Sequence, residues 1–177
     1  MQKPKAEEYN PYFSRYIDLV PEGVYIELLK TNTGSTAEFF RSIVPEKHDF
    51  RYAEGKWSPK EILMHLIDTE KVMNYRALAA ARRDVNIVLP NMDEDLYAQN
   101  AGAENRSMES LVDEFQAVRK VTEIFFENLK EEDSAYTALS EMNGQKSKIS
   151  ARAIGYLIPG HVMHHINTIK GRYLQIK

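Results

Sequence analysis

Histidines with metal-ligand spacing are the residues of this sequence best suited to chemistry. His161 and His165 stand four apart in the segment HVMHH, within a stretch whose apolar residues repeat with helical spacing. Residues four apart on a helix project from one face one turn apart, the spacing of two ligands for one metal ion. Both share the arc of the apolar residues, so we expect them to point inward. His65 has the same inward phase on a second predicted helix.

Three unpaired imidazoles in one core are costly, so inward histidines need a partner. We predict that His65, His161 and His165 bind a divalent metal, and Zn²⁺, Ni²⁺ and Fe²⁺ all suit three neutral imidazoles without a thiolate. The alternative is structural: His65 would donate to a backbone carbonyl, and the other two would bond Asp or Tyr side chains. Three protein ligands leave one coordination position open, as in catalytic zinc sites.

Other catalytic motifs are missing from the sequence. The chain has no cysteine, which excludes cysteine nucleophiles and disulfides. Val162 stands where HExxH metalloproteases place their general base, which argues against that chemistry. The sequence also lacks a phosphate-cradling glycine loop and a GxSxG nucleophile motif. A metal would therefore act on a bound water or directly on a substrate atom.

Polar residues beside the predicted ligands would orient them. Glu61, one turn before His65, and Asp68, three residues after it, are candidates to accept a hydrogen bond from the second ring nitrogen and fix the tautomer. Glu61 also occupies the third position of a helix capping box, which accounts for it without a metal. His164 lies at the edge of the inward arc, and we expect it at the surface or beside the ligands.

Four segments carry the helical pattern that would position these side chains. In the clearest, Ser58 is the N-cap, a proline follows, and Glu61 completes the capping box of a helix that runs to about residue 81. The other three helices are expected over residues 108–129, 150–174 and 23–43. Pro159 should kink the helix over 150–174, and the residues TNTGST at 31–36 leave the continuity of the helix over 23–43 open.

Four long amphipathic helices with little strand signal predict an all-α fold, a four-helix bundle. The connections 84–106 and 130–149 are long for a bundle, so its topology need not be up-down-up-down. Asn143-Gly144 in the second connection would suit the turn of a small hairpin. Glu70 lies on the apolar side of its helix, and we expect it to be buried and paired with Arg76 or Arg119.

Length and composition limit the class of protein. The 177 residues are 43% hydrophobic and carry a net charge of −3, which predicts one domain over 1–177, with residues 1–20 as a peripheral segment. The charge balance gives no footprint for nucleic acid or an anionic membrane, so small molecules or proteins remain as partners. With no secretory signal pattern or apolar run long enough to cross a bilayer, we expect a cytoplasmic protein.

Several stretches of the sequence resemble the DinB/YfiT-like superfamily. They follow the order of that family and cover most of the chain: KWSPKEILMHLIDTEKVMNYRALAAARRD at 56–84, LPNMDEDLY at 89–97, RSMESLVDEFQAVRKVT at 106–122 and ARAIGYLIPGHVMHHINTIKGRYL at 151–174. The resemblance implies a four-helix bundle with up-down-down-up topology. It also implies a divalent metal held by the same three histidines that the helical phase selects.

Members of this superfamily include enzymes that use a low-molecular-weight thiol for S-transfer or isomerisation, in which the metal activates the thiol. That chemistry suits a chain without cysteine, since the nucleophile would come with the cosubstrate. The leading expectation is therefore a thiol-dependent S-transferase acting on a small molecule. A metal-dependent hydrolase and a non-catalytic metal- or ligand-binding stress-response module are the alternatives.

The expected pocket lies between the two histidine-bearing helices. Residues 89–100 would form one of its walls, with Asp93 and Tyr97 among the lining side chains. The resemblance and the many aromatic side chains are also compatible with a homodimer.

Overall fold

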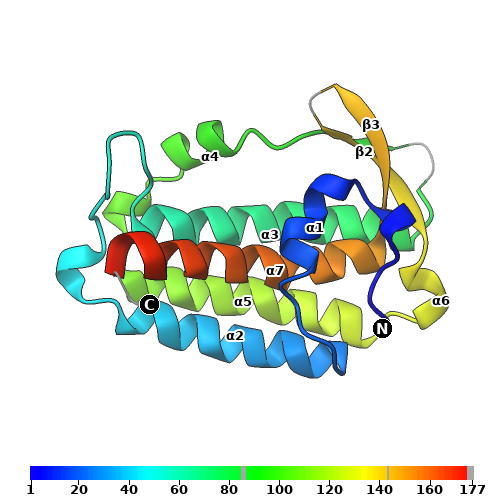
Figure 1. The fold of residues 1–177 in the computed structure, drawn as a ribbon, viewed down its shortest axis with the longest axis horizontal. Helices are drawn as coiled ribbons and strands as arrows, with labels where there is room; N and C mark the ends of the chain where they lie inside the picture. Colours follow the sequence, from blue (N-terminus) through cyan, green and yellow to red (C-terminus); the bar gives the residue numbers. More distant parts are fainter. Residues whose placement is uncertain (85–86, 143, 175–177) are drawn as a thin grey trace.

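Four long helices lie side by side and form a bundle. The structure is a computed structural model that describes residues 1–84, 87–142 and 144–174. The four helices are α2 (Tyr25–Ser42), α3 (Pro59–Ala81), α5 (Met108–Glu127) and α7 (Ala151–Ile169). Figure 1 shows that α2 and α7 run in one direction and α3 and α5 in the other, which is the up-down-down-up order. The predicted four-helix bundle is confirmed.

The start of α3 follows from its capping residues. Ser58 Oγ accepts a hydrogen bond from Glu61 N at 3.3 Å, and Glu61 Oε2 accepts one from Ser58 N at 2.6 Å. These two bonds satisfy donors that a helix N-terminus otherwise leaves free, and Pro59 has no donor to lose. The expected helix over 59–81 is confirmed, with His65 in its second turn.

The other helices match the sequence pattern with small differences. α5 begins after the N-cap Ser107 and ends two residues before the expected 129. α7 begins after the N-cap Ser150 and continues as one helix through Pro159, followed by a π-helical turn, Lys170–Leu174. α2 is continuous through residues 31–36. Packing outweighs weak propensity there, because side chains on both sides of that stretch are fully buried.

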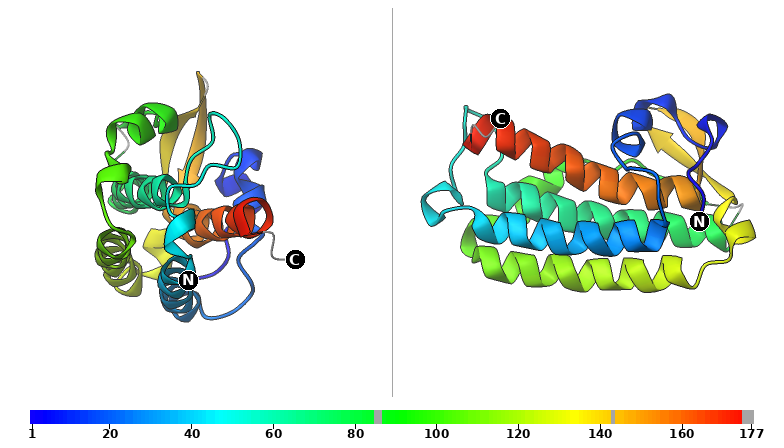
Figure 2. Two further views of the ribbon diagram at one scale, coloured as in Figure 1. Left: turned by 90° about the vertical axis from the view of Figure 1, so that its left-hand side faces the viewer. Right: turned by 60° about the horizontal axis from the view of Figure 1, so that its bottom comes forward.

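The bundle core is built from the inward faces of all four helices. Fully buried side chains include Phe40 of α2, Leu63 and Ile67 of α3, and Leu111 of α5, and Val162 of α7 packs into the same cluster. Seen end-on in Figure 2, the four helices lie side by side and α4 (Glu94–Asn100) lies outside α3. In the part of the chain that the structure describes, no helix has the length and apolar character needed to cross a bilayer.

A buried ion pair joins three of the helices. Arg119 Nε of α5 donates to Glu70 Oε1 of α3 at 2.8 Å, and Thr122 Oγ1 donates to the same carboxylate oxygen at 2.6 Å. Arg119 Nη1 also donates to Asn32 Oδ1 of α2 at 2.7 Å. Glu70 is thus buried and paired with an arginine as expected, and the partner is Arg119.

The long connection between α3 and α5 is a geometric necessity. The two helices are consecutive and parallel, so the chain must return along the length of the bundle before α5 begins. On the way it forms the short strand β1 (Val88–Leu89) and then α4. This return path carries residues 89–100 along α3, and residues 91–94 line a cavity that His65 also borders.

The second long connection contains a short helix, α6 (Glu131–Ser134), and a small hairpin. Strand β2 (Thr137–Met142) pairs antiparallel with β3 (Gln145–Ser150), and β1 adds to β2 in parallel. The sheet order is therefore β1-β2-β3. The predicted hairpin is present, although Asn143 of its predicted turn lies outside the described residues. The expected all-α fold thus carries one small sheet.

The N-terminal residues differ from the expected peripheral segment. They form two short 3₁₀ turns and α1 (Ser14–Ile17), which packs on α7. Ile17 and Val20 are 1% and 2% exposed and belong to the core. The segment is too short and too rich in turns for a helical pattern to reveal its buried side, so only the tertiary contacts show it.

Candidate metal centre

Three histidines from two helices meet at the inner face of α3. His65 Nε2 of α3 lies 3.3 Å from His161 Nε2 of α7, and His165 Nε2 lies 3.0 Å from the same atom. One ligand nitrogen from each ring falls within 4.8 Å of the other two. Nitrogens bound to one tetrahedral zinc at about 2.05 Å stand about 3.3 Å apart. The spacing of the three rings therefore fits a single ion.

The three imidazoles are in the protonation state that binds metals. Burial lowers the pKa of His65 to about 4 and, with repulsion from the neighbouring rings, the pKa of His165 to about 3. Burial and the other two rings also place the pKa of His161 well below its ordinary value. All three are neutral at pH 7. Their nitrogen lone pairs converge, and a shared cation satisfies all of them, whereas hydrogen bonds among three neutral rings cannot.

The residue that orients His65 is Thr69. Its Oγ1 lies 3.4 Å from His65 Nδ1 and can accept the proton of that nitrogen, which leaves Nε2 free for a metal. The sequence-based candidates are engaged elsewhere: Glu61 caps α3 and pairs with Arg51 at 2.6 Å, while Asp68 pairs with a lysine of its own helix. Thr69 is favoured because a residue four positions on shares the face of His65.

A close approach of α1 to α7 brings Tyr16 to the histidines. A Cβ atom on Gly160 would lie 2.1 Å from the Tyr16 carbonyl oxygen, so this contact requires glycine. The Tyr16 ring meets His161 edge to face at 5.3 Å between ring centres, and meets His164 in the same way at 5.2 Å. Burial raises the pKa of Tyr16 to about 12, so its hydroxyl keeps its proton. His164 thus lies beside the ligands, against Tyr16.

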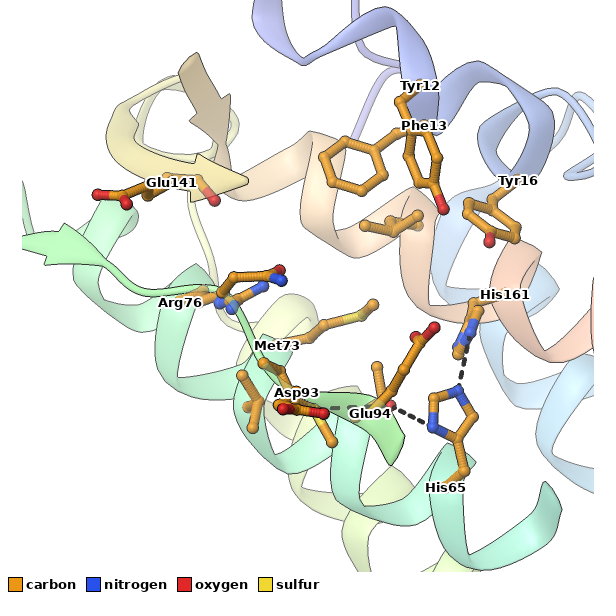
Figure 3. Close-up of a pocket in the computed structure, with 16 residues that line it drawn as sticks. Tyr12, Phe13, Tyr16, His65, Met73, Arg76, Asp93, Glu94, Glu141 and His161 are labelled. Atoms are coloured by element: carbon orange, nitrogen blue, oxygen red, sulfur yellow. Dashed lines mark hydrogen bonds between the residues drawn. The ribbon is translucent and has the colours of Figure 1, made fainter. Parts of the chain in front are cut away.

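A cavity of about 370 Å³ opens at His65 and His161, as Figure 3 shows. This is within the size range of small-molecule sites. His65, Thr69 and Arg76 of α3 line one side, and the return segment contributes residues 91–94 as a wall. Of the expected wall over 89–100, residues 91–94 line this cavity. Asp93 lines the cavity, whereas Tyr97 is 45% exposed and does not.

A second cavity, of about 230 Å³, reaches His165. His165 lines it together with Trp57 and Ile62 at the start of α3, Asp95 of α4 and Tyr173 after α7. The indole ring of Trp57 also packs against His65, with 4.7 Å between ring centres. His65 and His161 thus border the larger cavity, and His165 borders the smaller one.

Glu94, at the first position of α4, is a functional candidate that sequence reasoning missed. Figure 3 shows its carboxylate directed toward His161 inside the larger cavity. Partial burial, with repulsion from Asp95 and Asp93, raises the pKa of this carboxyl. No residue within the described ranges pairs or hydrogen bonds with it. The run of acidic residues at 93–95 was the available signal, but it could not tell which of them faces inward.

One known protein family matches most of the chain. The family model of the DinB superfamily matches residues 28–169, a range that contains all three histidines. The chain belongs to the DinB superfamily.

Relatives of this DinB protein agree with that assignment. A candidate metal-dependent hydrolase from Oceanobacillus iheyensis is 25% identical over 158 residues, which cover 85% of this chain and 88% of that protein. Among solved structures, YfiT from Bacillus subtilis, described as a candidate metal-dependent hydrolase with an unusual four-helix bundle topology, has a TM-score of 0.72 at 15% identity. The match covers 96% of this chain and 95% of the YfiT chain.

A second solved structure is more distant from this DinB protein. The mycothiol-dependent maleylpyruvate isomerase has a TM-score of 0.65 at 11% identity, over 85% of this chain and 61% of that one. At such identities the two structural matches show a shared fold.

Proposed function

We propose that this DinB protein is an enzyme that depends on a divalent metal and transfers a group to or from the sulfur of a low-molecular-weight thiol. The observation that carries the proposal is the position of the three histidines between two cavities. A site that joins a thiol to a second small molecule needs room for both at one reactive centre. A hydrolase, whose second substrate is water, has no such need.

The residues of the chain have distinct parts in this chemistry. His65, His161 and His165 would hold Zn²⁺, Ni²⁺ or Fe²⁺ through neutral nitrogens, and Thr69 would keep the His65 ring in its ligating tautomer. A divalent ion bound there lowers the pKa of a thiol or a water and so supplies a nucleophile near pH 7. The chain itself has no cysteine, so the sulfur would come with the cosubstrate.

The aromatic walls around the histidines would limit the access of water. Tyr16 covers one side of His161, and Trp57 covers one side of His65. Removing bulk water strengthens the electrostatic interactions within the site. Tyr16 keeps its proton and would donate a hydrogen bond to an electronegative group of the substrate.

A second candidate function is metal-dependent hydrolysis, which Glu94 favours. Its unpaired carboxylate faces His161 across the cavity and would accept a proton from an attacking water. The names of the relatives from Oceanobacillus iheyensis and Bacillus subtilis point the same way. In this function the smaller cavity would hold part of the same substrate.

Turnover with and without thiol separates these functions. Untagged protein is loaded with zinc, nickel or iron, its metal content is measured, and a panel of small thiols is assayed with model electrophiles and model esters and amides. Consumption of the electrophile that requires both thiol and metal supports the transferase. The matched variants are His65→Ala, which should lose this activity, and His164→Ala, which should retain it.

Other outcomes would contradict the proposal. Metal-dependent turnover without thiol that disappears in Glu94→Gln would establish the hydrolase. Tight metal binding with no turnover across the panel would favour a non-catalytic binding module.

A further inference from the structure

Arg76 lies at the far end of the larger cavity from the histidines. It follows His65 by eleven residues on α3, which returns it to nearly the same helix face about 16 Å further along the axis. Both residues line the cavity, and Figure 3 shows Arg76 well separated from His65 and His161. The cavity therefore runs along α3, with His65 and His161 at one end and the Arg76 guanidinium at the other.

Arg76 differs from the other covered arginines in having no carboxylate partner. Three further arginines that the structure describes are at least partly buried, and each forms an ion pair: Arg106 with Glu114, Arg119 with Glu70 and Arg152 with Glu8. Among the described residues, Arg76 has no acidic group within ion-pair distance. Its recorded hydrogen bond goes from Nη2 to the Pro90 carbonyl oxygen, which anchors the return segment.

An unpaired, largely covered guanidinium is costly for a protein to maintain. Burial lowers the pKa of Arg76, which reflects the lost hydration of its charge. A covered charge normally has a partner of opposite sign. The guanidinium has five N–H donors in a planar fork, and the bond to Pro90 uses only one side of it. The remaining donors match the two oxygens of a carboxylate.

We propose that the larger cavity binds an extended small molecule whose carboxylate is held by Arg76 while its reactive group lies at the three histidines. After allowing for the length of the arginine side chain, the two ends of the molecule must be on the order of 10 Å apart. Asp93, Glu94 and Glu141 also line the cavity, and their charges oppose a phosphate dianion more strongly than a carboxylate. The assignment of the reactive end rests on the proposed function; the contact with Arg76 does not.

The test uses two thiols of equal length, 6-mercaptohexanoate and 6-mercaptohexan-1-ol, on the full chain loaded with cobalt. The thiolate-to-cobalt absorption band reports the binding of each. The carboxylate should bind about 10- to 100-fold more tightly than the alcohol, the range expected for a charge-assisted hydrogen bond. In Arg76→Gln this preference should fall to about one, with binding of the alcohol unchanged. The control is Arg82→Gln, an exposed arginine just after α3 that should keep the preference.

Several outcomes would overturn the inference. A preference that survives in Arg76→Gln means that Arg76 does not bind the carboxylate. Inorganic phosphate and acetate are also compared as competitors of 6-mercaptohexanoate. If phosphate displaces the thiol more strongly than acetate does, the cavity prefers phosphate to carboxylate, which contradicts the assignment.

A second measurement separates this inference from the proposed function. If cobalt binds but neither thiol produces the band, the thiol chemistry fails and the Arg76 contact is tested without it. Hexanoate is then added to metal-free protein while the NMR resonance of the Arg76 Nε–H group is followed. A saturable shift, lost when hexan-1-ol replaces hexanoate, supports the carboxylate site, and no shift overturns it.

Discussion

The three histidines make the stability of the metal-free protein depend on pH in a predictable way. Burial lowers the pKa of His65 to about 4 and of His165 to about 3, and His161 is lowered as well. In the unfolded chain each returns to about 6.5. The unfolded state therefore binds more protons below pH 6.5, and stability must fall as the pH decreases from about 6.5 toward 4.

The expected loss follows from these values. At about pH 5 the native histidines are still neutral, while each unfolded one is 1.5 pH units below its pKa, so each costs about 2 kcal/mol. For the three rings together, the free energy of unfolding at about pH 5 should be about 6 kcal/mol lower than at about pH 7.5. A typical domain has about 5–15 kcal/mol in total, so the metal-free protein should be close to unfolding.

Urea unfolding in a chelator, followed by far-ultraviolet circular dichroism across this pH range, measures the effect. His65→Gln should reduce the pH-dependent loss by about 2 kcal/mol, because one titrating group is gone. Ile67→Val is the matched control: Ile67 is fully buried two residues away, and the variant should lose about 0.5–1.5 kcal/mol at every pH. A wild-type loss under about 2 kcal/mol, or an unchanged pH dependence in His65→Gln, would refute the buried neutral triad.

Two further predictions concern the metal and the packing around it. His165→Ala should weaken metal binding by more than about 100-fold, while His164→Ala should keep its metal, as measured by elemental analysis after dialysis; equal losses would contradict the ligand assignment. Gly160→Ala should cost about 1–3 kcal/mol in urea unfolding and displace Tyr16, because its new Cβ would lie 2.1 Å from the Tyr16 carbonyl oxygen. Gly34→Ala, whose Cβ meets no atom within 4 Å, should instead gain up to about 1 kcal/mol, and a similar loss in both variants would argue against the steric explanation.

Local patterns account for what could be predicted of the fold. The capping box of α3 and the N-caps Ser107 and Ser150 act within one helical turn, so their positions in the sequence were enough to place three helix starts. Helical phase likewise indicated that His161 and His165 share an inward face. The continuity of α2 could not be predicted in this way, because it depends on packing against other helices rather than on the propensity of residues 31–36.

Two parts of the site were missed, for different physical reasons. Thr69 lies on the same helix as His65, but its contact with His65 Nδ1 depends on side-chain rotamers. Glu94 faces the cavity only because the return segment passes over α3. Tyr97, one turn further along α4, is exposed instead. The acidic and aromatic composition of residues 89–100 says nothing about the direction of each side chain.

The helices, their inward faces and the inward direction of the three histidines could be predicted from local patterns, and the resemblance indicated the family. These follow from the 3.6-residue period and from short-range caps, which depend on neighbours within a few positions. Three features required the folded chain: Tyr16 covers His161, the histidines lie between two cavities, and Arg76 has no carboxylate partner among the described residues, whereas Arg119 has one. Those features arise where separate segments pack together, so they depend on distances that no local pattern encodes.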